Sequence, residues 1–131
     1  MASIFTRIIN REIPGYIVAE NEDAIAFLDI NPLNEGHTLV VPKKEVDKLF
    51  DLDEDTYLKL QASTHKVAQA IEKAIPCLRV GVAVIGLEVP HAHIHLIPLY
   101  GMHDIDFGRP KLKLSQEEFE GIAEKISSEF N

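Results

Sequence analysis

Cysteine is nearly absent from this sequence, and so are the segments that would place it in or across a membrane. Cys77 is the only cysteine among 131 residues, so no Cys-x-x-Cys pair exists and no disulfide can form within the chain. A single cysteine is typical of a reducing compartment. No apolar run approaches the length of a membrane span, and no basic-then-apolar N-terminus suggests export. We therefore expect a cytoplasmic protein that does not enter a membrane.

The sequence also lacks an excess of positive charge. Thirteen Lys and Arg residues face 21 Asp and Glu residues, which gives a formal net charge of −8. Because Lys and Arg dominate nucleic-acid binding, this balance argues against a nucleic-acid partner. A small nucleotide remains compatible, since a few local donors hold one or two phosphates. Repeats, low-complexity tracts and linkers are absent as well, so we expect one domain spanning residues 1–131.

The apolar spacing predicts an α+β fold with a five-stranded antiparallel sheet, a long helix and a C-terminal helix. Asp53 is placed to cap the long helix, whose apolar stripe runs until Pro76. Ser115 and Glu118 form a capping box for the last helix. A short first helix is expected over 3–10. The predicted strands are 16–19, 24–28, 37–41, 78–85 and 91–96, and the stripe of the long helix comprises Leu60, Thr64, Val67, Ala68, Ile71 and Ile75.

Three histidines at two-residue spacing, His91, His93 and His95, are the most informative feature of the chain. In an extended strand this spacing turns all three rings to one face, with the apolar residues between them on the other. Pro90 and Pro98 flank the run and are expected to delimit the strand. Three titratable rings side by side are costly to charge together near neutral pH, so we interpret them as a functional site.

The spacing favours a nucleophile over a metal site. Along a flat strand the outer two Cα atoms lie roughly 13 Å apart, whereas zinc needs its ligand nitrogens at about 2.0–2.1 Å. Chelation by all three rings is therefore strained, although a neighbouring pair with outside help stays open as an alternative. One nucleophile between two donors suits the spacing better: His93 would attack phosphorus, while His91 and His95 orient it or donate to phosphoryl oxygens.

The run from His91 to Ile97 resembles the His-φ-His-φ-His-φ-φ signature (φ, apolar) of the histidine triad (HIT) family of nucleotide hydrolases and transferases. The closest likeness is to its Hint-like branch. The resemblance extends to residues 26–32 and 36–43, and to Ile4-Phe5 and Ile8-Ile9 near the N-terminus. It implies hydrolysis of a purine nucleoside phosphoramidate or a dinucleoside polyphosphate, or nucleotidyl transfer, through a covalent nucleotidyl-histidine, with no metal or other cofactor. It also implies a homodimer.

The same resemblance assigns roles to further residues. It makes His37 a fourth active-site imidazole and Asp29 the residue that holds the ribose. From the residues alone, Asp29 could equally be a turn residue and His37 a strand-edge histidine. Nucleotide contacts are also implied for apolar residues that would otherwise read as ordinary core, and for two residues of the loop before the histidines. These are Ile4, Phe5, Ile8, Phe27 and Ile30 around the base, and Glu88 and Val89 in the loop.

Two departures from the family pattern affect what we expect. Glu88 stands where a small polar residue commonly contacts the phosphate or leaving group, and its carboxylate favours a basic amine leaving group over a second phosphate. Thr6 stands where some bacterial relatives carry a cysteine of a structural zinc site, so no structural zinc is expected. Three residues lie where contacts to a partner's site could form, or are plain loop residues: Met102, His103 and Phe107. Two other functions stay open, a His-based metallohydrolase and a nucleotide-binding interaction protein with weak turnover.

Overall fold

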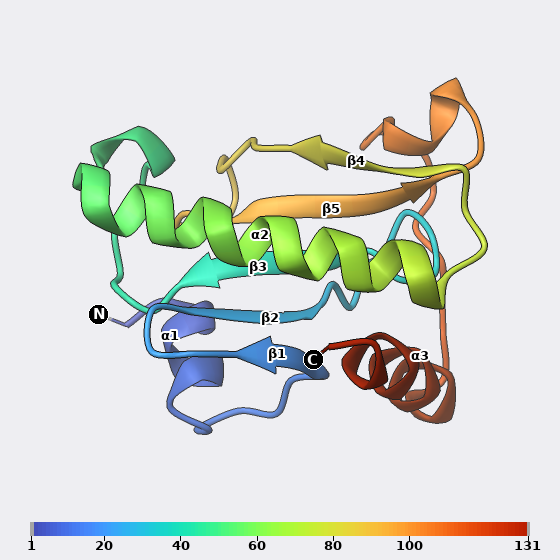
Figure 1. Ribbon diagram of the computed structural model, residues 1–131, viewed down its shortest axis with the longest axis horizontal. Helices are drawn as coiled ribbons and strands as arrows, with labels where there is room; N and C mark the ends of the chain where they lie inside the picture. The colour runs from blue at the N-terminus through green and yellow to red at the C-terminus, as the bar shows by residue number, and fades with distance from the viewer. Residues whose placement is uncertain (1, 131) are drawn as a thin grey trace.

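The computed structural model describes residues 2–130 and confirms the predicted fold class. Five antiparallel strands form one sheet in the order β1-β2-β3-β5-β4 (Figure 1). None of the helices in the described part of the chain is long and apolar enough to cross a membrane. In chain order the α-helices and strands are α1 (Ile4–Ile9), β1 (Ile17–Glu20), β2 (Ala24–Leu28), β3 (Thr38–Pro42), α2 (Glu54–Ala74), β4 (Arg79–Ala83), β5 (Ile94–Leu99) and α3 (Gln116–Ser128), and two short 3-10 helices cover Leu49–Asp51 and Met102–Ile105.

The helix signals in the sequence are confirmed at both long helices. The Asp53 side chain accepts the Thr56 N–H and begins α2, and Ser115 with Glu118 forms the predicted capping box of α3. The buried stripe of α2 is as predicted except that Ala70 is buried where Ala68 was expected. His65 on the same helix is exposed.

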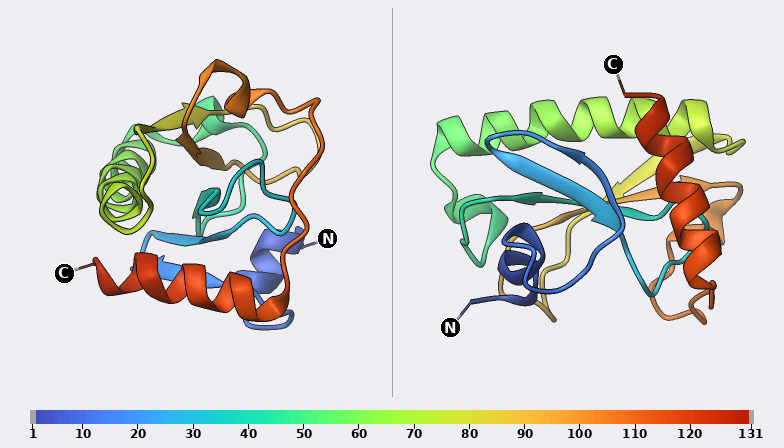
Figure 2. Two further views of the ribbon diagram at one scale, coloured as in Figure 1. Left: turned by 90° about the vertical axis from the view of Figure 1, so that its right-hand side faces the viewer. Right: turned by 90° about the horizontal axis from the view of Figure 1, so that it is seen from below.

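Helices α2 and α3 cover one face of the sheet, and α1 lies against the other (Figure 2). The alternation of β2 shows the division. Ala24, Ala26 and Leu28 join the large core beneath α2 and α3, whereas Ile25 and Phe27 join a smaller cluster with α1. Hereafter these are called the helix-covered face and the histidine face, because the four histidines of the site belong to the second.

The predicted strand over 91–96 is wrong at both ends. The His91 N–H bonds back to the Val89 carbonyl, and the Ala92 N–H bonds to Val46 in a loop, so β5 begins only at Ile94. Pro98 lies inside β5 instead of ending it. Pairing with β3 stops at Leu96, so on that side no ladder bond is lost at Pro98, whose carbonyl accepts from the Asn34 side chain.

Candidate active site

Four buried histidines meet beside the neighbouring strands β3 and β5 on the histidine face. His37 directly precedes β3, His91 and His93 lie in the segment that leads into β5, and His95 is in β5. His91 is fully buried, while His93 and His95 keep 7% and 8% of their surfaces exposed. The loop before β3 brings His37 to the cluster through Gly36. This glycine has φ +96°, and an added Cβ would lie 3.0 Å from the Ile75 side chain.

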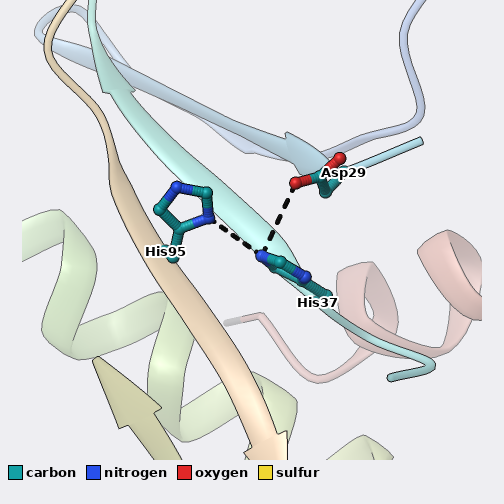
Figure 3. A group of neighbouring side chains, drawn as sticks. All are labelled: Asp29, His37 and His95. Carbon is teal, nitrogen blue, oxygen red and sulfur yellow. Dashed lines mark hydrogen bonds and ion pairs between the residues drawn. The ribbon is translucent and has the colours of Figure 1, made fainter. Parts of the chain in front are cut away.

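A main-chain donor sets the proton positions on His37 and His95. The Leu33 N–H donates to His37 Nδ1 at 3.0 Å, so the neutral ring carries its proton on Nε2. That Nε2 lies 2.9 Å from His95 Nδ1, which therefore accepts the proton in a hydrogen bond (Figure 3). His95 is left with its own proton on Nε2. The chain Leu33–His37–His95 thus supplies an N–H donor on the outer nitrogen of His95.

His93 is oriented the opposite way. Its Nδ1 lies 2.8 Å from the His91 carbonyl oxygen, which can only accept, so the proton sits on Nδ1 and the lone pair on Nε2. The Phe5 ring packs edge-on against His93 at 5.0 Å between centroids, and the centroid of the His95 ring also lies 5.0 Å from that of His93. His93 consequently presents an unprotonated nitrogen in a fixed orientation, as a nucleophile requires.

Both nitrogens of His91 are occupied by protein partners. Nε2 donates to the Pro42 carbonyl at 2.7 Å, and Nδ1 accepts from Ser3 Oγ, also at 2.7 Å. With no free N–H, His91 does not have a donor to offer to a phosphoryl oxygen. Of the two roles predicted for it, the geometry supports the orienting one, which acts through its main-chain carbonyl.

Burial favours the neutral form of three of the imidazoles, those of His37, His91 and His95. Desolvation lowers the pKa of His37 to about 3, with the neighbouring His95 as a second cause, and lowers the pKa of His95 to about 4. Burial also lowers the pKa of His91. The Asp29 pKa is raised, first by burial, while the hydrogen bond from the Asn31 N–H opposes the shift. His37, His91 and His95 are therefore neutral at neutral pH.

One group of side chains has the composition of a metal site. Donor atoms of Asp29, His37 and His95 lie within 4.8 Å of one another, and Asp29 Oδ2 is 3.6 Å from His37 Nε2. A metal on His37 Nε2 would displace the proton that belongs there and move it to Nδ1, where it would meet the Leu33 N–H. The 2.9 Å separation of the two ring nitrogens is a hydrogen-bond distance. The proton arrangement therefore fits a hydrogen-bonded pair better than a metal centre.

Comparison with known proteins identifies the family. A family profile described as HIT domain matches residues 10–102. The chain belongs to the HIT domain family. It is 33% identical over 133 residues to an adenosine 5′-monophosphoramidase from Schizosaccharomyces pombe, covering 98% of both chains. It is 36% identical to an uncharacterized HIT-like protein of Borreliella burgdorferi, covering 95% of both. A crystal structure of a Hit-like protein from Bartonella henselae superimposes with a TM-score of 0.84 at 34% identity, covering 98% of this chain and 96% of that one.

The predicted base-contacting residues of this HIT domain divide into two groups. Phe5, Ile8 and Phe27 are buried together on the histidine face, with the Phe5 and Phe27 rings 5.4 Å apart. Ile4 and Ile30, by contrast, are exposed, at 49% and 63% of their surfaces. The apolar residues that sequence composition suggested as core thus include two that face solvent.

The loop before the histidines places its two predicted residues differently. Glu88 is exposed. Burial is the main cause of the raised pKa of Asp29, and the charge of Glu88 is a smaller cause. Val89 is partly buried against the cluster that contains Phe5. Both remain predicted nucleotide contacts.

The contacts of several residues around the histidines were not found from the sequence, including those of Phe107, for which the sequence suggested only a contact to a partner. Phe107 packs edge-on against His95 at 4.9 Å and against His37 at 6.2 Å within its own chain. Arg109 holds the His37 loop by donating to the Leu33 carbonyl at 2.6 Å. Neither residue belongs to a periodic pattern, so no local signal marks them. Ser3 could have been recognised as a helix cap, but its contact with His91 joins residues 88 positions apart.

Proposed function

We propose that this HIT domain hydrolyses purine nucleoside phosphoramidates through a covalent nucleotidyl intermediate on His93. The observation that carries the proposal is the bond from His93 Nδ1–H to the His91 carbonyl, which leaves Nε2 as a free base. Relatives named adenosine 5′-monophosphoramidase in two yeasts, at 33% and 36% identity, support the substrate class. The coarser activity, nucleotide hydrolysis, is that of the family.

The chemistry takes two displacements. In the first, His93 Nε2 attacks the α-phosphorus, the P–N bond of the substrate breaks, and the amine leaves with a proton taken from solvent. The N–H on the outer nitrogen of His95 stabilises a phosphoryl oxygen. Because burial lowers the pKa of His95, its ring is neutral and places no positive charge beside the His93 nucleophile. In the second, water attacks phosphorus and gives up a proton to solvent, the bond from phosphorus to His93 Nε2 breaks, and the nucleoside monophosphate leaves with Nε2 unprotonated again. An acceptor other than water would make the same intermediate a nucleotidyl transferase.

The remaining predicted residues are assigned to substrate binding. Asp29 Oδ2 accepts the ribose hydroxyls, since Oδ1 already accepts the Asn31 N–H. The exposed Ile4 and Ile30 contact the base over the buried Phe5 and Phe27. Glu88 lies on the leaving-group side, where a carboxylate attracts a protonated amine and repels a second phosphate.

The test of the mechanism is release of AMP from adenosine 5′-phosphoramidate with EDTA present throughout. Wild type is expected to turn over, and His93→Ala to fall to the background rate. His65→Ala, which removes an exposed histidine of α2, is the matched control and keeps full activity. Intact mass after rapid quenching is expected to show one added nucleotidyl group on wild type only. Equal turnover by His93→Ala, or activity lost in EDTA and restored by zinc, would contradict the proposal. Bound nucleotide without product would support a binding protein instead.

The role of Glu88 is tested by a change of leaving group. Hydrolysis of an adenylyl-lysine phosphoramidate by wild type is compared with hydrolysis of a dinucleoside polyphosphate, and both are repeated with Glu88→Gln. The substitution is expected to slow the amine substrate and to speed the polyphosphate. Faster polyphosphate turnover by wild type, untouched by the substitution, would remove Glu88 from the leaving-group site.

We also propose that two copies pair along β4. Among the described residues β4 pairs with β5 alone, so its outer edge is free to extend the sheet. Val82 in this strand and Leu78 just before it are 60% and 79% exposed, which is unusual for apolar residues on a strand edge. Light scattering is expected to give the mass of a dimer for wild type and of a monomer for Val82→Lys. A monomeric wild type would overturn the pairing. The cytoplasmic location stays a prediction from composition.

A further inference from the structure

Side chains from three segments that are distant in sequence meet around His91, next to the proposed nucleophile His93. Ser3 and Thr6 come from the start of α1, Glu45 follows β3, and His91 precedes β5. Glu45 Oε1 accepts the Ser3 N–H at 2.8 Å and the Thr6 hydroxyl at 2.5 Å. Ser3 Oγ lies 2.7 Å from His91 Nδ1, and Thr6 Oγ1 lies 3.4 Å from the same nitrogen. We call Ser3, Thr6 and Glu45 the α1 anchor.

Ser3 makes two hydrogen bonds through one hydroxyl. Its oxygen accepts the Thr6 N–H at 3.0 Å, which caps α1. Its proton has two possible acceptors, His91 Nδ1 at 2.7 Å and Thr6 Oγ1 at 3.3 Å. The shorter contact is favoured, because the Pro42 carbonyl already holds the other His91 nitrogen as a donor and leaves Nδ1 with a lone pair. Ser3 is itself only 7% exposed, so water cannot easily replace it.

The ring of His91 is thereby fixed at both nitrogens, by β3 on one side and by the α1 anchor on the other. The carbonyl of this same residue accepts the His93 Nδ1–H and so decides where the His93 lone pair points. The first residues of α1 also bring the Phe5 ring to within 5.0 Å of His93. One short helix therefore reaches the nucleophile twice, once through His91 and once by direct packing.

We propose that Ser3 is a positioning residue for catalysis, which aligns His93 through His91 while Glu45 holds the start of α1 in place. The proposal rests on the proposed function for its kinetic readout. The role of Ser3 is distinct from capping. The cap uses the hydroxyl oxygen of Ser3 as an acceptor, whereas the bond to His91 uses the hydroxyl proton.

Ser3→Ala removes both bonds, and Ser3→Thr keeps the hydroxyl. With adenosine 5′-phosphoramidate as substrate, Ser3→Ala is expected to lower kcat by about tenfold or more with KM changed by less than about threefold, because misplaced reacting groups slow chemistry more than binding. Ser3→Thr is expected to recover most of the wild-type kcat. Ser115→Ala is the matched control, since it removes the serine cap of α3 away from the site. It is expected to lower stability through the lost cap and leave kcat unchanged.

Nitrogen-15 NMR of the histidine rings provides a readout independent of turnover. In wild type, His93 is expected to show a single Nδ1–H tautomer and His91 a single Nε2–H tautomer. In folded Ser3→Ala the His91 Nδ1 signal is expected to shift because that nitrogen loses its hydrogen-bond donor, and the His93 signals are expected to shift because the His91 carbonyl moves. In Ser115→Ala neither should change. Ring signals unchanged in Ser3→Ala, or a kcat loss equal in the two cap variants, would overturn the proposal. An inactive wild type would refute the proposed function, and the ring signals would then decide the role of Ser3 alone.

Discussion

The two faces of the sheet are built by different means. The helix-covered face buries a large apolar core under the 21-residue α2 and the 13-residue α3. The histidine face has a six-residue helix and a much smaller apolar cluster, and its histidines are held by hydrogen bonds to main-chain and side-chain partners. Burial therefore stabilises the fold on one side, while directional bonds fix proton positions on the other. Substitutions on the two faces should therefore affect different measurements.

The largest change in stability is expected on the helix-covered face. Ile71 on α2 is fully buried, so Ile71→Ala should lower the free energy of unfolding by about 2–5 kcal/mol through lost burial and a cavity. Urea unfolding measures the loss. The kcat of the folded variant, measured where both proteins are native, should equal that of wild type. A selective fall in kcat would show that the two faces are not separable.

The next largest effect is a pH dependence that comes from the histidine face. The pKa values of His37 and His95, about 3 and about 4 when folded, lie below the ordinary value of 6.5. As pH falls below about 6.5, the unfolded chain takes up protons that the folded chain does not, so stability decreases. Each group contributes a slope approaching about 1.4 kcal/mol per pH unit. The lowered pKa of His91 acts in the same direction, and the raised pKa of Asp29 opposes it.

Urea unfolding of wild type and His37→Gln at pH 7.5, 6 and 5 measures this dependence. The variant lacks one of the titrating rings and is expected to lose less stability on acidification. Parallel curves for the two proteins would mean that His37 is not responsible.

A smaller effect is expected where an aromatic side chain shields the histidines. Phe107→Ala removes the edge contact to His95 and should cost about 0.5–1.5 kcal/mol of stability. Water admitted to His95 should move its pKa upward toward the ordinary value. The acid limb of the kcat/KM profile should therefore shift to higher pH. Phe50→Ala, at a phenylalanine that is 82% exposed, is the control and should leave the profile in place.

The smallest effect is expected for a histidine on the outer surface of α2. His65 is exposed, so His65→Ala should change the free energy of unfolding by less than about 0.5 kcal/mol. Thermal unfolding and AMP release check this. A loss of activity comparable to that at the buried histidines would mean that the site extends beyond the histidine face.

The sequence predicted the helix-covered face well because periodicity and caps are local signals. The stripe of α2, its Asp53 cap and the capping box at Ser115 all depend on residues within a few positions of one another. The apolar run over 24–28, between two clusters of turn-forming residues, likewise predicted a strand with the observed bounds. On this face, the helices and strands that the local sequence favours are therefore the ones found in the fold.

The histidine face was predicted in its residue types but not in its arrangement. Two-residue spacing suggested three rings on one strand, whereas β5 begins at Ile94 and His91 is tied to β3 and α1. The tautomers depend on the Leu33 N–H and the His91 carbonyl. Any residue type has a main-chain carbonyl, and any except proline has a main-chain N–H. Such main-chain contacts leave no trace in composition or spacing.

The bond between His93 and the His91 carbonyl has a consequence for how the site tolerates mutation. Its acceptor is a peptide oxygen, so no change of side chain at position 91 deletes it. Drift at this position can weaken the alignment of the proposed nucleophile gradually, but it cannot abolish the acceptor in one step. A descendant sequence that keeps this chain path and an imidazole at position 93 inherits the unprotonated nitrogen, whatever substrate the surrounding loops come to select.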